Sequence, residues 1–246
     1  MTQAFIFGLV AGLALLLGAV VGLKVKPSQA VTAVIMAFGS GVLIAALTFE
    51  LIDEAFRAGG IVPVSVGFLA GASSFVIADW LLEKKGGHSR KRLKGERSSF
   101  DGDAQGLAIA FGALLDGIPE SVMIGVGLLA GTGAGLLMFA AVFLSNVPEG
   151  ISGVAGLSKT DKSKTFIMGI WVGIAVACAC ASLAGYKYLA NASGATLAVV
   201  SSLAAGSILA MISDTMIPEA FEDGGVFVAM STVVGFLAAF IIAKLA

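Results

Sequence analysis

Two short segments place a proline and a glutamate inside long apolar runs. Residues 116–121 read DGIPES and residues 145–150 read SNVPEG. A carboxylate at the depth of a lipid bilayer costs about 2.5–3.5 kcal/mol on insertion scales. Neither apolar run contains a Lys or Arg that would offset this cost. The two segments therefore indicate a path for an external cation, either a metal ion or a proton.

The polar residues of the two segments have helical spacing. Asp116 and Glu120 are four residues apart, and so are Ser145 and Glu149, while Asn146 precedes Glu149 by three. Residues three or four apart share one face of a helix. If the two helices pack together, we expect these faces to meet and to enclose a cation with oxygen ligands.

The prolines add to this prediction. Pro119 and Pro148 each lack a backbone N–H and crowd the carbonyl four residues earlier, those of Leu115 and Leu144. A freed carbonyl inside a membrane needs a new partner, which a metal ion or water can supply. We expect the two helices to bend at the same depth and to make room for a site.

Two further acids lie deep in apolar segments. Glu50 and Asp214 are predicted to line the cation path. Other acids stand near the expected helix ends, where solvation explains them as well as cation attraction at the two mouths does. These are Asp53, Glu54, Glu219, Glu222 and Asp223.

Composition indicates an integral membrane protein. Of the 246 residues, 58% are hydrophobic and only 13% are charged, against about 25% charged in soluble domains. A membrane-spanning helix needs about 20 apolar residues. The sequence predicts one all-α, polytopic domain over residues 1–246 with eight spans. They are 3–23, 31–54, 61–82, 104–130, 133–157, 165–187, 196–219 and 225–244.

Charge predicts the orientation of these spans. Of the 15 Lys and Arg residues, 12 fall in three loops on one side, after spans one, three and five. The positive-inside rule makes that side cytoplasmic and places both termini outside. The loop 83–103 is expected to be flexible, with the lone His88 solvated in it. Short loops and the absence of a targeting peptide favour the inner membrane of a prokaryotic cell.

An internal repeat relates the two ends of the chain. Residues 41–60 align without gaps to residues 206–225, at an offset of 165, and share Glu-Ala-Phe and Gly-Gly. Residues 67–71 (GFLAG) are echoed by residues 235–239 (GFLAA). Spans one to three thus resemble spans six to eight, and the two spans between them make the repeats run in opposite directions. Inverted repeats around a central site are a transporter design.

With these motifs the chain resembles the ZIP (Zrt/Irt-like) family of divalent metal transporters. That family has eight helices, external termini and a variable loop after span three. Its span-four motif, His-Asn-x-Pro-Glu-Gly, corresponds here to Asp116, Gly117 and Glu120. The resemblance implies further site positions in spans five and seven. In span five they are Ser145, Asn146 and Glu149. In span seven they are Asp214 and Thr215, which precede Pro218 and Glu219.

The chain departs from the family pattern in its ligand types. No histidine remains in the predicted spans, and span six has no carboxylate, only Cys178 and Cys180, which we interpret as packing residues. We therefore expect one main site, not a two-metal site. Its predicted members are Asp116, Glu120, Ser145, Asn146 and Glu149. Carboxylate and carbonyl oxygens are preferred by cations that are harder than Zn²⁺. An all-oxygen site therefore favours Mn²⁺ or Fe²⁺.

The resemblance implies uptake of a Zn, Fe or Mn ion into the cytoplasm, with the metal bound as substrate and no resident cofactor. Metal ions and membrane lipid are the expected partners, and nucleic acid is not. An alternative is a proton-linked transporter of another small solute that uses the same carboxylates. An intramembrane enzyme is disfavoured, because the spans lack histidine and any Gly-x-Ser-x-Gly motif. The glycine-rich helices would also suit a homodimer interface.

Overall fold

The computed structural model describes residues 1–84, 102–130, 132–157 and 163–245. These residues form helices joined by short turns, without a strand. The elements are α1 (Thr2–Lys24), α2 (Gln29–Ala46), η1 (Leu47–Ile52), α3 (Asp53–Gly59), α4 (Ile61–Lys84), α5 (Gly102–Ala130), α6 (Thr132–Leu157), α7 (Lys164–Leu189), α8 (Gly194–Met211), η3 (Ile212–Met216), α9 (Ile217–Gly224) and α10 (Phe227–Leu245).

Eight helical rods within the described residues are long and apolar enough to cross a membrane. The chain is an all-α, polytopic membrane protein, as predicted. The second and seventh rods run on to Gly59 and Gly224, past the predicted ends at residues 54 and 219. Of the predicted loop 83–103, residues 85–101 with His88 lie outside the described residues.

The sequence repeat is also a structural repeat. Ser28 and Ser193, 165 residues apart, each cap a helix by accepting a hydrogen bond from the backbone N–H three residues later. Gly60 and Gly225, again 165 apart, both adopt positive φ, +78° and +57°. Only glycine takes such a conformation without strain, which explains why the Gly-Gly pairs recur at this offset.

A feature that the sequence did not predict also follows the repeat. The π-helical segments η1 and η3 begin 165 residues apart, in the middle of the second and seventh rods. A π turn holds one residue more per hydrogen-bonded ring than an α turn does, and such turns occur often at functional sites. Each long rod therefore changes its helical pitch at the same place.

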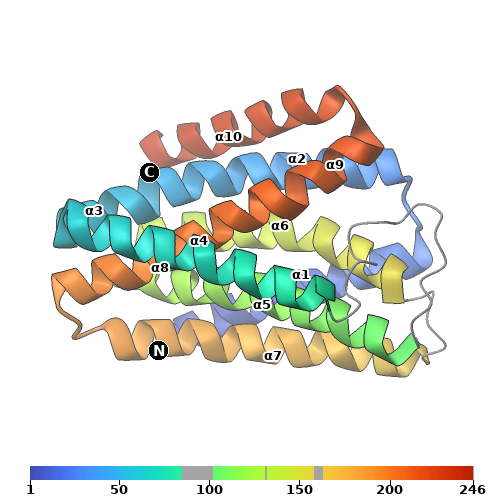
Figure 1. Ribbon diagram of the computed structural model, residues 1–246, viewed down its shortest axis with the longest axis horizontal. Helices are drawn as coiled ribbons and strands as arrows, with labels where there is room; N and C mark the ends of the chain where they lie inside the picture. Colours follow the sequence, from blue (N-terminus) through green and yellow to red (C-terminus); the bar gives the residue numbers. More distant parts are fainter. Residues whose placement is uncertain (85–101, 131, 158–162, 246) are drawn as a thin grey trace.

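The two repeats pack against each other through two equivalent helix pairs. The last helix of each repeat lies against the second helix of the other, α4 against α8 and α10 against α2 (Figure 1). Glycines allow this close approach. A Cβ on Gly41 would collide with the carbonyl of Thr232, and a Cβ on Gly206 with that of Phe68. Small residues at such crossings are typical of helices packed in lipid.

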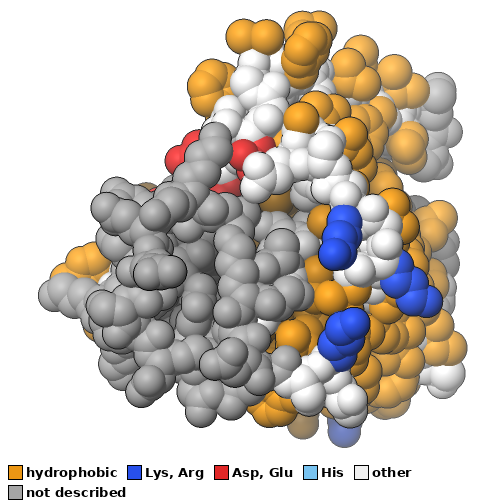
Figure 2. Space-filling view, turned by 90° about the vertical axis from the view of Figure 1, so that its right-hand side faces the viewer, with side chains coloured by type: hydrophobic (Ala, Val, Ile, Leu, Met, Phe, Trp, Pro, Cys, Tyr) orange, Lys and Arg blue, Asp and Glu red, His pale blue; other side chains and the backbone are white. Residues whose placement is uncertain are grey.

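The central helices α5 and α6 pack against each other and are enclosed by the repeats. α6 lies against α1 and α2, whereas α5 lies against α7 and α8. Both chain termini lie at one end of the bundle, and α1, α4 and α6 finish at the other (Figure 1). Figure 2 looks onto that second end and shows basic side chains there, with a small acidic group. We call it the basic end.

Candidate functional site

The predicted site lies where α5 and α6 face each other. Both helices continue through their internal prolines. Four of the five predicted members are almost completely buried: Asp116 is 2% exposed, Glu120 0%, Ser145 0% and Asn146 1%. Glu149 is partly buried. The structure thus brings all five positions of the predicted main site into the interior of the bundle.

Glu120 is the most unusual side chain of this site. It is among the largest fully buried side chains of the described structure. Neither of its carboxylate oxygens has a hydrogen-bond partner among the described residues. The charges of Glu149 and Asp116 both repel it. Burying a carboxylate without a hydrogen bond or an opposite charge is strongly unfavourable, so Glu120 stands in a position that a cation would stabilise.

The two polar neighbours on α6 have different roles. The Asn146 amide donates a hydrogen bond to the backbone carbonyl of Ala11 on α1, at 2.8 Å. Its carbonyl oxygen Oδ1 has no hydrogen-bond partner in the described part of the chain. The Ser145 hydroxyl donates to the carbonyl of Val142 at 3.0 Å. Asn146 therefore ties α6 to α1 through its amide N–H, while its Oδ1 is still able to accept a bond. Ser145 instead donates its hydroxyl proton within its own helix.

Glycines in both motifs serve packing. A Cβ on Gly150 would collide with the carbonyl of Leu15, so this glycine lets α6 approach α1 closely. A Cβ on Gly117 would lie 3.1 Å from Cys178 Sγ on α7. The positions next to the acids are therefore small because neighbouring helices approach there.

The site is not arranged as a closed metal cage. Within the described residues, no three His, Cys, Asp or Glu side chains are close enough together to hold a metal ion. Neighbouring carboxylates repel each other, as Glu120 and Glu149 do here. Side-chain rotation would be needed to bring these carboxylates onto one cation.

The two outlying acids lie on other elements of the bundle, η1 and η3. Glu50 lies in η1, partly buried, and the charges that act on it are those of Lys244 and Asp53. Asp214 lies in η3 and is exposed, in contrast to the buried Asp116 and Glu120. The structure therefore gathers the residues of α5 and α6, while Glu50 lies in a separate group of charges near the chain terminus.

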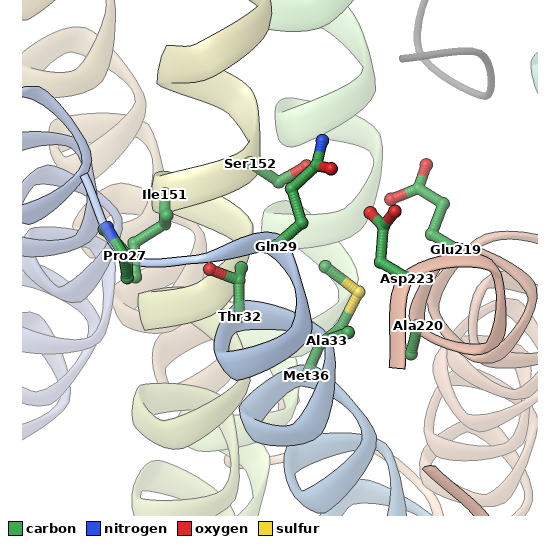
Figure 3. A pocket seen from close by; sticks show the side chains of 10 residues that line it. All are labelled: Pro27, Gln29, Thr32, Ala33, Met36, Ile151, Ser152, Glu219, Ala220 and Asp223. Atoms are coloured by element: carbon green, nitrogen blue, oxygen red, sulfur yellow. The ribbon is translucent and has the colours of Figure 1, made fainter. Parts of the chain in front are cut away.

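A cavity of about 170 Å³ lies at the basic end, between α2, α6 and α9 (Figure 3). Among the described residues, its polar lining comes from Gln29, Thr32, Ser152, Glu219 and Asp223, none of which is basic. Ser152 follows Glu149 by three residues on α6, so the two share a helix face. The cavity thus reaches α6 about one turn from the buried carboxylates.

The sequence did not predict that α7 takes part in the surroundings of the site. Cys178 is fully buried, and the charges of Glu120 and Glu149 act on its thiol. Its apolar neighbours in the sequence give no sign of this position. The sequence did not predict the cavity at the basic end either, because the residues that line it come from three separate helices.

No protein-family model matches this chain, and no curated protein matches it. The resemblance to the ZIP family accordingly remains a prediction based on the motifs in α5, α6 and the seventh rod.

Proposed function

We propose that this protein carries divalent metal cations of the Zn, Fe or Mn type across the membrane, through the site between α5 and α6. The observation that supports this most is the Glu120 carboxylate, fully buried and without a hydrogen bond in the described structure. Glu149 and Asp116 surround it with further negative charge. A divalent cation would offset the repulsion among all three groups at once.

Each ligand has a separate role in this proposal. Glu120 and Glu149 come from different helices and would bridge the cation between α5 and α6. Asp116 adds a carboxylate one turn from Glu120, and Asn146 offers its Oδ1, which is held in place because the other end of the amide is anchored on Ala11. Oxygen ligands of this kind bind Mn²⁺ and Fe²⁺ readily and also accept Zn²⁺.

The cavity supplies a route between the site and the basic end. On α2, Gln29, Thr32 and Met36 line it at helical spacing. Farther along α2, a Cβ on Gly39 would lie 3.1 Å from the Ser145 backbone, so α2 and α6 converge at the site. A cation leaving Glu149 would pass Ser152 and then Glu219 and Asp223 of α9. By the positive-inside rule this end would be cytoplasmic, and a cation that leaves through it would enter the cell.

Access from the opposite end would come from the inverted repeats. Two repeats of similar structure but opposite direction can exchange conformations, so that the site faces one side and then the other. The carboxylates would release protons when the metal arrives, which makes transport dependent on pH.

The test is metal flux into vesicles that contain the purified protein, with Zn²⁺, Mn²⁺, Fe²⁺ and Mg²⁺ measured in parallel. The wild type is compared with Glu120→Gln, which keeps the size of the side chain and removes its charge. Glu222→Gln is the matched control, because Glu222 is an exposed acid on α9. We expect saturable flux in the wild type and the control, and a loss of at least about 100-fold in Glu120→Gln.

Proton flux is measured in the same vesicles without metal. Proton movement that needs Glu120 and no metal would favour the proton-linked transporter instead. The absence of any metal flux above that of empty vesicles, with protein that elutes as one symmetric species, would contradict the proposal.

A further inference from the structure

Ser182 of α7 lies at a junction of three helices. Its side chain is 0% exposed, and its hydroxyl donates a hydrogen bond to the backbone carbonyl of Ala4 on α1, at 2.8 Å. A Cβ on Gly8, one turn farther along α1, would lie 2.5 Å from the Ser182 Cβ, so α1 and α7 approach closely here. A Cβ on Gly125 of α5 would collide with the Ser182 backbone carbonyl. Ser182 therefore contacts α1 with its side chain and α5 with its backbone.

The same helix α1 holds one of the predicted ligands. The carbonyl of Ala11 accepts the hydrogen bond from Asn146 Nδ2 on α6, at 2.8 Å. Ala4 and Ala11 are both 0% exposed and lie about two turns apart on α1. Helix α1 is thus tied to α7 through Ser182 and to α6 through Asn146, in each case by a buried side chain that donates to its backbone.

These connections bear on the site because its ligands come from different helices. Glu120 belongs to α5 and Asn146 to α6, and neither the Glu120 carboxylate oxygens nor Asn146 Oδ1 have a hydrogen-bond partner among the described residues. Two oxygens can bind one cation only if both lie within about 2.0–2.6 Å of it. Their separation depends on how α5 and α6 are held, and Ser182 is where α5 meets the helix that anchors Asn146.

We propose that Ser182 is a positioning residue of the cation site, which acts through α1 to set the separation of Glu120 and Asn146 without touching the cation. This inference rests on the proposed transport function. Close packing at Gly8 and Gly12 keeps α1 against α7, but apolar contacts have no preferred direction. A hydrogen bond has a narrow range of length and angle, so the Ser182 hydroxyl fixes the position of α1 along α7.

A second buried serine provides a matched control. Ser202 of α8 is also 0% exposed, but its hydroxyl donates to the Ala198 carbonyl of its own helix, at 2.6 Å. Replacing either serine by alanine removes one hydroxyl and one buried hydrogen bond. Of these two bonds, only the one from Ser182 joins different helices, so a comparison of the two variants isolates the contribution of that connection.

The experiment measures the binding of Mn²⁺ alone and of Zn²⁺ alone to the full-length purified protein by titration calorimetry. We expect the dissociation constant to rise by roughly fivefold in Ser182→Ala, the factor that corresponds to one hydrogen bond. In Ser202→Ala it should stay close to that of the wild type. Ser182→Cys keeps a weaker donor and should give an intermediate value, and it replaces the alanine variant if that variant does not fold.

A double variant separates positioning from a general loss of structure. Asn146→Ala removes the ligand through which Ser182 acts, so Ser182→Ala should cause little further loss of affinity in that background. The same loss of affinity with and without Asn146 would overturn the inference. Equal losses in Ser182→Ala and Ser202→Ala would overturn it as well.

The outcomes also separate this inference from the transport function. Binding and flux that depend on Glu120 but are unchanged in Ser182→Ala would leave the transporter intact and remove Ser182 from its site. Binding that weakens in Ser182→Ala, without flux of any ion, would support the positioning role and contradict the transporter. A wild type that binds neither Mn²⁺ nor Zn²⁺ would contradict both.

Discussion

The two ends of the bundle are built from equivalent parts of the repeat, yet their charges differ. At the basic end, Glu219 and Asp223 of α9 line a cavity with no Lys or Arg among the lining residues that the structure describes. At the opposite end, the equivalent helix α3 carries Asp53 paired with Arg57 at 2.7 Å. Glu54, which precedes Glu219 by 165 residues, lies near the charges of Glu50 and Arg57, of which Glu50 has the larger effect.

This difference shows that backbone symmetry and chemical symmetry are separate properties of the molecule. The caps, the glycine turns and the Glu54/Glu219 pair recur at a fixed offset, whereas Asp53, Arg57 and Asp223 have no equivalent in the other repeat. The structure thus has an acid-lined cavity at the basic end, and an Asp53–Arg57 ion pair at the other. The proposed transport cycle would exchange these two arrangements of the backbone, while each mouth keeps its own charges.

The largest expected effects test the symmetric part of this comparison. Gly41→Val and Gly206→Val should destabilise the protein to a similar degree, by about 1–3 kcal/mol or more. In each variant the new side chain would meet a backbone carbonyl of the helix from the other repeat, Thr232 or Phe68. Thermal unfolding in detergent, followed by size-exclusion chromatography, would measure both variants.

Gly173→Val is the control for this pair, since a Cβ at Gly173 meets nothing within 4 Å. A variant pair in which one crossing tolerates valine and the other does not would show that the two helix pairs are not equivalent.

An intermediate effect tests the unequal charges. Glu219→Gln should reduce cation flux by roughly threefold at low salt, and by less at high salt, because screening weakens attraction at a mouth. Glu54→Gln, the same substitution at the equivalent position, should change flux much less because Glu54 is not among the residues that line the cavity. Initial rates of Zn²⁺ and Mn²⁺ flux at two ionic strengths would measure both. Equal losses in the two variants would remove the functional difference between the mouths.

The smallest effect concerns the ion pair itself. Arg57→Ala should change the free energy of unfolding by less than about 1 kcal/mol, because exposed ion pairs contribute little. Both partners are well exposed, Arg57 at 77% and Asp53 at 50%. Denaturation midpoints of the variant and the wild type would check this. A loss of several kcal/mol would mean that Arg57 stabilises that end of the bundle through more than an exposed ion pair.

The architecture and the central site could be predicted because their signals are local. Apolar runs of sufficient length define the spans, and four-residue spacing places Asp116 with Glu120 on one face. Predicting that the two segments form one site then required a single assumption, that α5 and α6 pack together. The two helices do pack against each other in the structure. The coordination of a metal by these residues remains a prediction.

Other features depend on contacts that the sequence does not encode locally. The place of Cys178 beside Gly117 is set by how α7 crosses α5, and the cavity by how α9 lies over α2 and α6. The position of the Glu50 side chain could not be predicted for a different reason, the local change of helix type. Counted along an ideal α-helix, it falls fourteen residues, or two heptads, after Met36, and would share the face of α2 that lines the cavity. The π-helical segment η1 contains Glu50 and shifts this count, so its side chain lies near Lys244 and Asp53.

The paired π-helical segments have a consequence for chain length. Each holds one residue beyond what an α-helix needs for the same turn. Within the described residues they are therefore the positions where a single-residue deletion would restore an ordinary α-helix rather than break one. Such a deletion in η1 or η3 would remove the extra residue and leave the segment beyond it near its present orientation, whereas a deletion in a regular α-helix would rotate that segment by about 100°. For a protein engineer, the same two segments are the places where one codon can be removed while α3 or α9 keeps its orientation.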